Sequence, residues 1–283
     1  MSVLVIQENG RHDANRRFRE CFCIQREIDA MGLRDPCEVW GLGHKNFARV
    51  PDFSKYDYIF CLENYDNGWV PHAEIAKCRG EKYLWSIDSH VTGVARFRRA
   101  FEAGKYTKLL FSCKRDATES TDMWFPNCAD RFLFRPNPMP RDIPIGFCGN
   151  YVTGQRKRLV KTFAECFGDK FKENIFVIGD AMLDVIWRTR LNLNLNISYD
   201  FNYRNFETTA CGTALLTSFH PDMEELGFID GKTCIVYKTV EEALDKAKFY
   251  LSVPDLTQKI ADAGAELTHA RHTYGRFRLF FGC

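Results

Sequence analysis

The chain has 283 residues, of which 39 are Lys or Arg and 37 are Asp or Glu, so its formal net charge is +2. A hydrophobic fraction of 45% with 27% charged residues is typical of a globular protein and excludes extensive disorder. The near-zero charge excludes binding to nucleic acid through a general surplus of basic side chains, so any polyanion site must be a local patch.

The sequence also lacks the signals of a membrane or disulfide-rich protein. No stretch approaches the roughly 18 uninterrupted apolar residues of a membrane-spanning helix, and the apolar start at Val3–Ile6 is too short for a secretory signal. The twelve cysteines are scattered without a Cys-x-x-Cys pair, which favours reduced thiols in a core over disulfides or a zinc site. We therefore expect a cytoplasmic protein (in the host cytoplasm if a phage encodes it) with no membrane partner.

In the first half of the chain, short β-branched or aromatic segments alternate with longer amphipathic ones. The predicted strands are Val3–Gln7, Cys37–Trp40, Tyr58–Leu62, Tyr83–Ile87 and Lys108–Ser112. The predicted helices are Asn15–Met31, ending at Gly32, then Val70–Cys78 and Val94–Ala103. This alternation predicts a parallel sheet with helices on both faces.

The segment 134–144 interrupts the pattern with four prolines in eleven residues, which predicts an extended linker outside any helix or central strand. The alternation then restarts. The predicted strands are Ile145–Cys148, Ile175–Ile178, Asn192–Ile197, Ala214–Thr217 and Cys234–Tyr237. The predicted helices are Gln155–Phe167, Ala181–Arg188, Tyr203–Cys211, Val240–Leu251 and Asp255–Leu267. The pattern thus predicts an α/β protein of two Rossmann-like halves. In each half, ligands are expected to bind at the carboxyl ends of the strands.

The polar loop before Tyr203 leads into a helix whose first N–H groups can bind an anion. Glu207 lies one turn further along, where its carboxylate can accept hydrogen bonds from neutral hydroxyls beside the anion. The alternative is an ordinary helix with a solvated Glu207. Gly212 is expected to end this helix.

These residues belong to a set of motifs that resembles the CgeB-type glycosyltransferases of the GT-B fold group. The longest motif is Arg204-x-Phe206-Glu207-x-x-Ala210-Cys211-Gly212-x-x-Leu215-Leu216-Thr217. Ile145–Gly149 followed by Arg156 looks like the opening of the same domain, and segments 250–264 and 272–276 look like its end. In the first half, Trp85-x-x-Asp88-x-His90 resembles a further family motif. The resemblance is most specific over about 145–276.

The resemblance implies two Rossmann-like domains facing an interdomain cleft. The acceptor-side domain would be residues 1–140 and the nucleotide-sugar domain 141–267, with a tail, 268–283, that packs back toward the first domain. It implies sugar transfer from a nucleotide-diphosphate sugar to a hydroxyl, with no metal and no resident cofactor. No Asp-x-Asp pair occurs in the chain, so fixed positive groups are expected to stabilise the diphosphate.

By resemblance, Glu207 matches the acidic residue that holds the donor's ribose, and Arg156 the basic residue that faces its diphosphate. A cationic cluster at 156–158 is unfavourable at a helix start, which favours a phosphate partner over plain solvation. The remaining candidate donor-binding residues are Gly149, Asp200, Asn202, Tyr203, Arg204 and Asn205.

Asp88 and His90 follow a predicted strand, where one of them can take the acceptor hydroxyl's proton. The alternative is that Asp88 caps a helix and His90 is an ordinary polar residue. His12 and Asp13 form a second candidate pair, with a helix cap as the alternative for Asp13. The other histidines at 44, 72 and 220 are expected at the surface.

Basic clusters lie at 16–19, 96–99 and 114–115, and solvated helix faces are their default interpretation. The sharper hypothesis is an anionic acceptor such as DNA with a hydroxylated base, contacted by Arg96 and Arg99 and stacked on Trp69 or Trp124. Two other functions stay open: a nucleotide-sugar epimerase or hydrolase on the same scaffold, and a non-catalytic nucleotide-sugar-binding protein.

Overall fold

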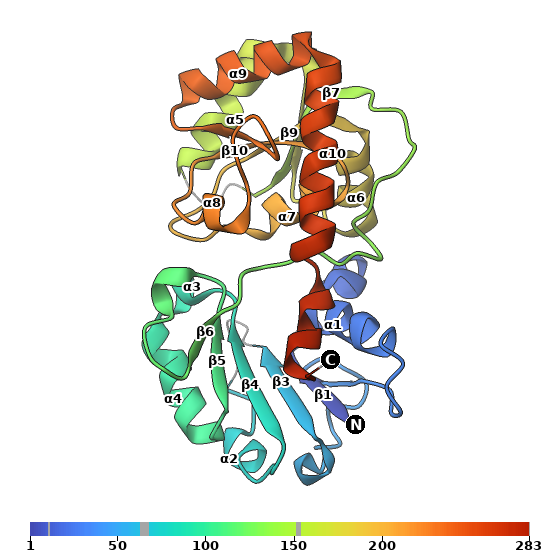
Figure 1. Ribbon diagram of the computed structural model, residues 1–283, viewed down its shortest axis with the longest axis vertical. Helices are drawn as coiled ribbons and strands as arrows, with labels where there is room; N and C mark the ends of the chain where they lie inside the picture. The colour runs from blue at the N-terminus through green and yellow to red at the C-terminus, as the bar shows by residue number, and fades with distance from the viewer. Residues whose placement is uncertain (11, 63–67, 151–153, 283) are drawn as a thin grey trace. The chain divides into compact units, whose positions relative to one another are not determined.

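The computed structural model describes residues 1–10, 12–62, 68–150 and 154–282. They form two compact α/β units, the first made of Met1–Asn127 and Tyr274–Cys283 and the second of Cys128–Thr273. Each unit is built on one parallel sheet, as the alternation of strand and helix patterns predicts (Figure 1). The sequence placed its domain boundaries at 140 and 267, whereas the compact units divide at 127 and 273.

The first unit has a six-stranded sheet in the order β2-β1-β3-β4-β5-β6, with all neighbouring strands parallel. Its strands are β1 (Val3–Ile6), β2 (Glu38–Trp40), β3 (Tyr58–Leu62), β4 (Glu81–Ser86), β5 (Lys108–Phe111) and β6 (Asp122–Trp124). The register pairs Val5 with Phe60 and Phe60 with Tyr83. The edge strand β6 was missed because three residues, one of them charged, give no alternating pattern.

The helices of the first unit are mostly short. They are α1 (Glu20–Asp29), α2 (His72–Ile75), α3 (Ser89–Thr92), α4 (Val94–Gly104) and the 3₁₀ segments η1 (Asp13–Phe18), η2 (Phe53–Lys55), η3 (Lys114–Asp116) and η5 (Tyr274–Phe280). The predicted helix over 15–31 is wrong in its first part, because the backbone is extended at Arg19 (ψ 143°). Gln7 explains where α1 starts: its buried side-chain oxygen accepts a hydrogen bond from the Cys21 N–H at 2.9 Å.

Alternate residues of the first sheet pack against different elements. Ile59 and Cys61 join one core cluster with Phe97 of α4. Phe60, between them in the strand, faces the other side and contacts Phe277 of η5, with 5.0 Å between ring centroids. The C-terminal segment therefore completes the second face of this sheet, and both chain ends lie in the first unit.

The second unit has a five-stranded parallel sheet in the order β11-β10-β9-β7-β8. Its strands are β7 (Ile143–Gly149), β8 (Phe171–Ile175), β9 (Thr189–Asn194), β10 (Ala214–Ser218) and β11 (Ile235–Tyr237). The strand predicted over 175–178 is wrong: β8 ends at Ile175, and Phe176 has a left-handed φ of 57°. The linker prediction is wrong at its end, since Pro144 lies in β7. β7 pairs with β8 only from Ile145 onward, so the missing N–H of Pro144 does not cost a hydrogen bond to β8.

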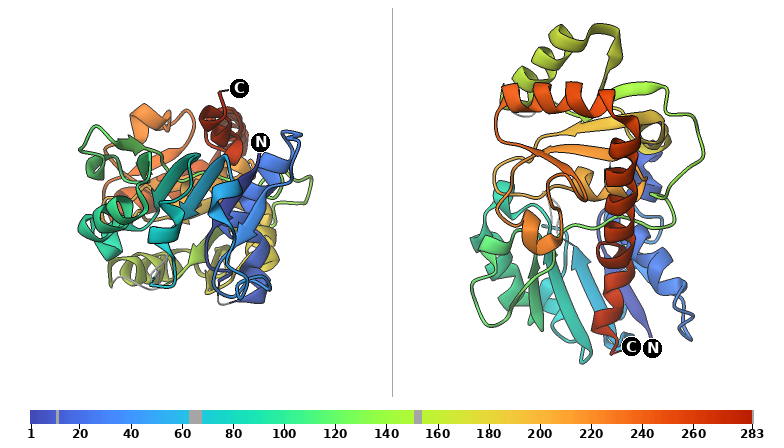
Figure 2. Two further views of the ribbon diagram at one scale, coloured as in Figure 1. Left: turned by 90° about the horizontal axis from the view of Figure 1, so that it is seen from below. Right: turned by 45° about the horizontal axis from the view of Figure 1, so that its top comes forward.

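The helices of the second unit lie close to their predicted positions. They are α5 (Gly154–Phe167), α6 (Gly179–Arg188), α7 (Tyr203–Ala210), α8 (Met223–Leu226), α9 (Val240–Ser252), α10 (Pro254–Arg271) and the 3₁₀ segment η4 (Gly168–Lys170). After α9 the chain turns sharply at Val253 into the long helix α10, drawn in red (Figure 2). Gly212, just beyond α7, has a left-handed φ of 64°, which confirms that it ends this helix.

The two faces of the second sheet differ in chemistry. Leu191 and Leu193 of β9 belong to an apolar cluster with residues of α5, α9 and α10. Asn192 and Asn194 alternate with them and are buried on the face toward α7, where Asn192 Nδ2 donates to Thr208 Oγ1 at 2.8 Å. Helix α7 is thus attached to the sheet by hydrogen bonds, which fixes its orientation more specifically than apolar packing does.

Cys166 is exposed, and the other described cysteines are buried, in agreement with their predicted place in the core. Among the described residues, no helix is both long enough and apolar enough to cross a bilayer.

Candidate functional site

The carboxyl ends of β7, β9 and β10 carry the polar groups of the candidate site in the second unit. The loop between β9 and α7 leads through Asp200, which is buried, to Asn202 at the start of α7. The Asn202 side chain makes no capping hydrogen bond and instead donates from Nδ2 to Leu195 O at 3.1 Å. Helix α7 therefore begins without a side-chain cap, an arrangement that suits an external anion.

Asn205 fixes the first turn of α7 against the sheet. Its Nδ2 donates to Asn196 Oδ1 at 2.7 Å and to Asn202 O at 3.0 Å. Its Oδ1 accepts from Asn194 Nδ2 at 3.0 Å and from Thr217 Oγ1 at 2.8 Å. Because Asn205 is fully buried and its amide is saturated by the protein, its role in this structure is to position the helix start.

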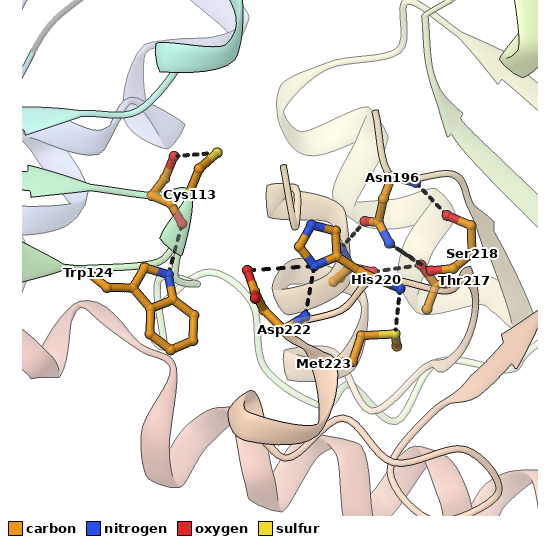
Figure 3. Close-up of polar contacts among 10 residues, drawn as sticks. Cys113, Trp124, Asn196, Thr217, Ser218, His220, Asp222 and Met223 are labelled. Atoms are coloured by element: carbon orange, nitrogen blue, oxygen red, sulfur yellow. Dashed lines mark hydrogen bonds and ion pairs between the residues drawn. The ribbon is translucent and has the colours of Figure 1, made fainter. Parts of the chain in front are cut away.

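Asn196 extends the same network to the end of β10. Its backbone N–H donates to Ser218 Oγ at 2.9 Å, and its Nδ2 donates to Ser218 O at 2.8 Å (Figure 3). The loops that follow β9 and β10 are thereby fastened together. Of the residues in this network, Asn205 was predicted as a donor-binding residue, whereas Asn194, Asn196, Thr217 and Ser218 were not, although they lie at the carboxyl ends of predicted strands.

Arg156 lies in the first turn of α5 and is buried, whereas its neighbours Lys157 and Arg158 are exposed. Its Nη1 donates to Asn150 Oδ1 at 3.0 Å, and its Nη2 donates to Leu195 O at 3.1 Å. The guanidinium thus links the carboxyl ends of β7 and β9. Burial, followed by the positive charge of Arg204, lowers the pKa of Arg156, so its cation is held in a site where a bound anion would be strongly stabilising.

Glu207 and Arg204 form an ion pair one helical turn apart on α7, with 2.8 Å between Oε2 and Nη1. Both side chains are mostly buried, so the alternative of a solvated Glu207 is wrong. Arg204 also donates from Nη2 to Met182 Sδ at 3.0 Å. The pair places one carboxylate beside the cationic groups of the site.

Gly149 and Tyr203 lie in the same part of the second unit. Gly149 ends β7, and a side chain there would bring Cβ within 2.9 Å of the Phe147 ring. Its carbonyl accepts from the Phe176 N–H at 2.9 Å. Tyr203 is the first residue of α7. The structure therefore brings the predicted donor-binding residues to one edge of one sheet.

Two residues at this edge were not predicted to belong to the site. Phe176, directly after β8, is 74% exposed and has a positive φ, which is unusual for a bulky residue. His220, two residues after β10, is only 3% exposed, so its predicted surface location is wrong. The ring of Phe201 covers it, with 5.6 Å between centroids.

The candidate catalytic residues lie in the first unit. Asp88 and His90 follow β4, and Asp88 is the N-cap residue of α3 but makes no capping hydrogen bond with its side chain. Between them, Ser89 Oγ donates to Asp116 Oδ2 at 2.6 Å, which connects the loops after β4 and β5. The capping interpretation of Asp88 is therefore not supported by its side-chain geometry.

His12 and Asp13 follow β1, which β3 separates from β4 in the sheet. Both are exposed, and Asp13 Oδ1 forms an ion pair with Arg16 Nη2 at 2.7 Å. The N-cap residues of η1 and α1 are His12 and Arg19, so the capping interpretation of Asp13 is wrong.

The candidate acceptor contacts have different environments. Trp69 packs against Trp40 and Phe47, each with 5.7 Å between ring centroids, so it belongs to an aromatic cluster of the first unit. Arg99 is exposed on α4, and Arg96 on the same helix is half-buried. Elsewhere in the first unit, Trp124 donates from Nε1 to Ser112 O at 3.2 Å (Figure 3).

The second unit thus presents two arginines, an uncapped helix start and a neighbouring carboxylate. Fixed cations and helix N–H groups bind phosphate oxygens and stabilise negative charge that develops on them. The carboxylate of Glu207 is suited to accept hydrogen bonds from sugar hydroxyls. Taken by itself, neither unit brings three described His, Cys, Asp or Glu side chains into an arrangement able to hold a metal ion.

Comparisons with known proteins agree with this description. Residues 148–277 match a family model described as glycosyl transferase-like. No curated protein sequence matches the chain.

Several solved structures share the fold over nearly the whole chain. HepE of Anabaena, in complex with UDP and glucose, has a TM-score of 0.66 at 11% identity, covering 100% of this chain and 98% of that one. β-Glucosyltransferase of phage T4 has a TM-score of 0.65 at 14% identity, covering 99% and 98%. Sucrose-phosphate synthase of Thermosynechococcus elongatus has a TM-score of 0.64 at 12% identity, covering 99% and 97%. The chain therefore has the fold of the GT-B glycosyltransferases, and its residues 148–277 resemble the glycosyl transferase-like family.

Proposed function

We propose that this protein transfers a sugar from a nucleotide-diphosphate sugar to a hydroxyl acceptor without a metal ion, and that it is of the CgeB type. The observation that carries the proposal is the buried Arg156 beside Arg204 and Glu207 at the uncapped start of α7. As the glycosidic bond breaks, the diphosphate leaving group gains negative charge. Arginines held in place by the protein stabilise that charge without reorganising, which is the task a divalent cation performs in metal-dependent enzymes.

For the donor, we propose a uridine nucleotide. HepE of Anabaena, whose fold this chain shares, has been solved with UDP and with UDP-glucose. In the present chain, Glu207 would hold the ribose hydroxyls, and the exposed ring of Phe176 is available to stack on the base.

For the acceptor, we propose a hydroxyl on an anionic polymer, with a hydroxylated base in DNA as the leading case. Arg96 and Arg99 on α4 lie on the helix that follows the Asp88–His90 segment, so cationic groups and a candidate base share one part of the first unit. Asp88 or His90 would take the proton of the attacking hydroxyl. A base in duplex DNA would have to be flipped out of the stack to reach them.

The function is tested by incubating the purified protein with UDP-, ADP-, GDP- and dTDP-sugars in EDTA, with and without DNA that contains 5-hydroxymethylated cytosine. We expect a hexose mass shift on the modified nucleoside that EDTA does not abolish. Loss of transfer in EDTA, restored by a divalent cation, would refute metal independence. Donor conversion without an acceptor would instead indicate an epimerase or hydrolase, and tight binding without any turnover a binding protein.

Glu207→Ala is expected to weaken donor binding by about 1–3 kcal/mol, the contribution of a hydrogen bond that involves a charged group. Glu207→Gln should lose less, because the amide still accepts a hydrogen bond from a ribose hydroxyl. Calorimetric titration with the donor nucleotide measures both effects. Glu224→Ala, which removes an exposed carboxylate of α8, is the matched control. Unchanged affinity in a folded Glu207→Ala variant would remove Glu207 from the site.

A further inference from the structure

His220 is a buried imidazole at the carboxyl end of β10 that neither the sequence motifs nor the proposed donor contacts include. Its Nδ1 accepts a hydrogen bond from the Asp222 backbone N–H at 3.2 Å. Asp222 Oδ2 lies 3.8 Å from the same nitrogen. Both dashed lines at the ring in Figure 3 end on this nitrogen. The other ring nitrogen, Nε2, is buried and has no hydrogen-bond partner among the described residues.

These contacts fix the tautomer of a neutral His220. Because Nδ1 accepts a hydrogen bond from an N–H group, the ring proton must lie on Nε2. The Nε2–H group of His220 is therefore a hydrogen-bond donor for which the described part of the protein provides no acceptor. A buried donor without an acceptor is costly, so such groups are rare in folded proteins unless a ligand or water completes them.

The surroundings of His220 connect it to the phosphate-binding part of the second unit. Its ring packs against Phe201, which lies between Asp200 and Asn202 in the loop leading to α7. The strand end that precedes it is hydrogen-bonded to Asn196 through Ser218. His220 thus lies against the loop that precedes the uncapped start of α7. It lies on the β10 side of β9, whereas Arg156 lies on the β7 side.

We propose that His220 donates a hydrogen bond from Nε2 to a phosphate oxygen of the donor's diphosphate, and so is a further donor-binding residue. This inference rests on the proposed function. The Asp222 N–H orients the imidazole, and the ligand supplies the acceptor that the buried Nε2–H lacks. Hydrogen bonds to anionic oxygens are stronger than neutral ones, so a phosphate satisfies this donor better than a sugar hydroxyl does.

The test compares two substitutions of His220, one that keeps a hydrogen-bonding group near the position of Nε2 and one that keeps it near the position of Nδ1. His220→Gln places an amide N–H near the position of Nε2, whereas His220→Asn places its amide near Nδ1 and leaves the outer position empty. Each variant is titrated calorimetrically with the best-binding compound among UDP, ADP, GDP and dTDP, and with the corresponding nucleoside. His269→Asn is the control, because His269 lies in the same unit with its Nε2 bonded to Ala210 O at 2.9 Å.

We expect His220→Asn to lower diphosphate affinity by roughly tenfold to a hundredfold and to leave nucleoside affinity unchanged. His220→Gln should recover part of the loss, and the control should not change the ratio of the two affinities. Equal loss for diphosphate and nucleoside, or no recovery in His220→Gln, would show a structural role and overturn the inference. So would normal diphosphate affinity in His220→Asn. If the wild-type protein bound none of the four diphosphates, the proposed function itself would fail, which is a different result.

Discussion

Arg156→Ala is expected to lower the turnover number for sugar transfer by about 10²–10³-fold, the effect of removing one preorganised donor from a transition-state charge site. Donor affinity should fall by a smaller factor. The reason is that the negative charge on the leaving diphosphate grows as the glycosidic bond breaks, so the guanidinium binds the transition state more strongly than the bound donor. Steady-state and single-turnover kinetics, with the donor that the panel of nucleotide sugars identifies, measure the two effects separately.

The geometry makes a second variant informative. Arg156 also donates to Asn150 Oδ1 and Leu195 O, so alanine removes both a charge and a link between two loops. Arg156→Lys keeps the charge but not the planar fork, and an intermediate loss of turnover is expected. Arg158→Ala, two residues along the same helix and exposed, is the control and should leave turnover unchanged. A rise in the Michaelis constant alone for Arg156→Ala would refute its role in the transition state.

The parallel sheets could be predicted from the sequence because their strands carry short, buried apolar runs. β3 and α7 begin at their predicted residues, and most other elements lie within a few residues of theirs. Local sequence patterns do not predict the backbone conformation where a contact with a distant residue determines it. The start of α1 depends on a hydrogen bond from Cys21 to Gln7, and no helical periodicity reports such a bond.

The candidate site shows the same division. Arg156 and Glu207 could be proposed from sequence because each lies in a local motif at a helix start. Asn205 was also proposed as a donor-binding residue, but the amide network around it could not be predicted, since Asn194, Asn205 and Thr217 come together only when β9, α7 and β10 are assembled. Their spacings of 11 and 12 residues match no local sequence pattern that would predict a contact between them. Trp69, predicted to stack on an extruded base, packs against Trp40 and Phe47, and this contact could not be predicted from the sequence either.

Phe277→Ala is expected to destabilise the first unit by about 3–5 kcal/mol, the usual cost of truncating a fully buried phenylalanine. Phe277 is completely buried, and its ring lies 5.0 Å from Phe60, 5.3 Å from Phe125 and 6.0 Å from Trp85 between centroids. These partners come from β3, β4 and the segment after β6, so the cavity would open beneath half of the sheet. Removing η5 entirely should be at least as damaging.

Urea unfolding followed by tryptophan fluorescence measures this effect selectively. Of the five tryptophans, Trp187 lies in the second unit and the other four in the first, at positions 40, 69, 85 and 124. Leu279→Ala is the matched control, because Leu279 is 67% exposed in the same segment and its loss should change the unfolding free energy by less than about 0.5 kcal/mol. Equal shifts for both variants would mean that the C-terminal segment does not form part of this core. A large shift for Phe277→Ala alone would establish that the first unit depends for its stability on a segment that follows the whole second unit in the sequence.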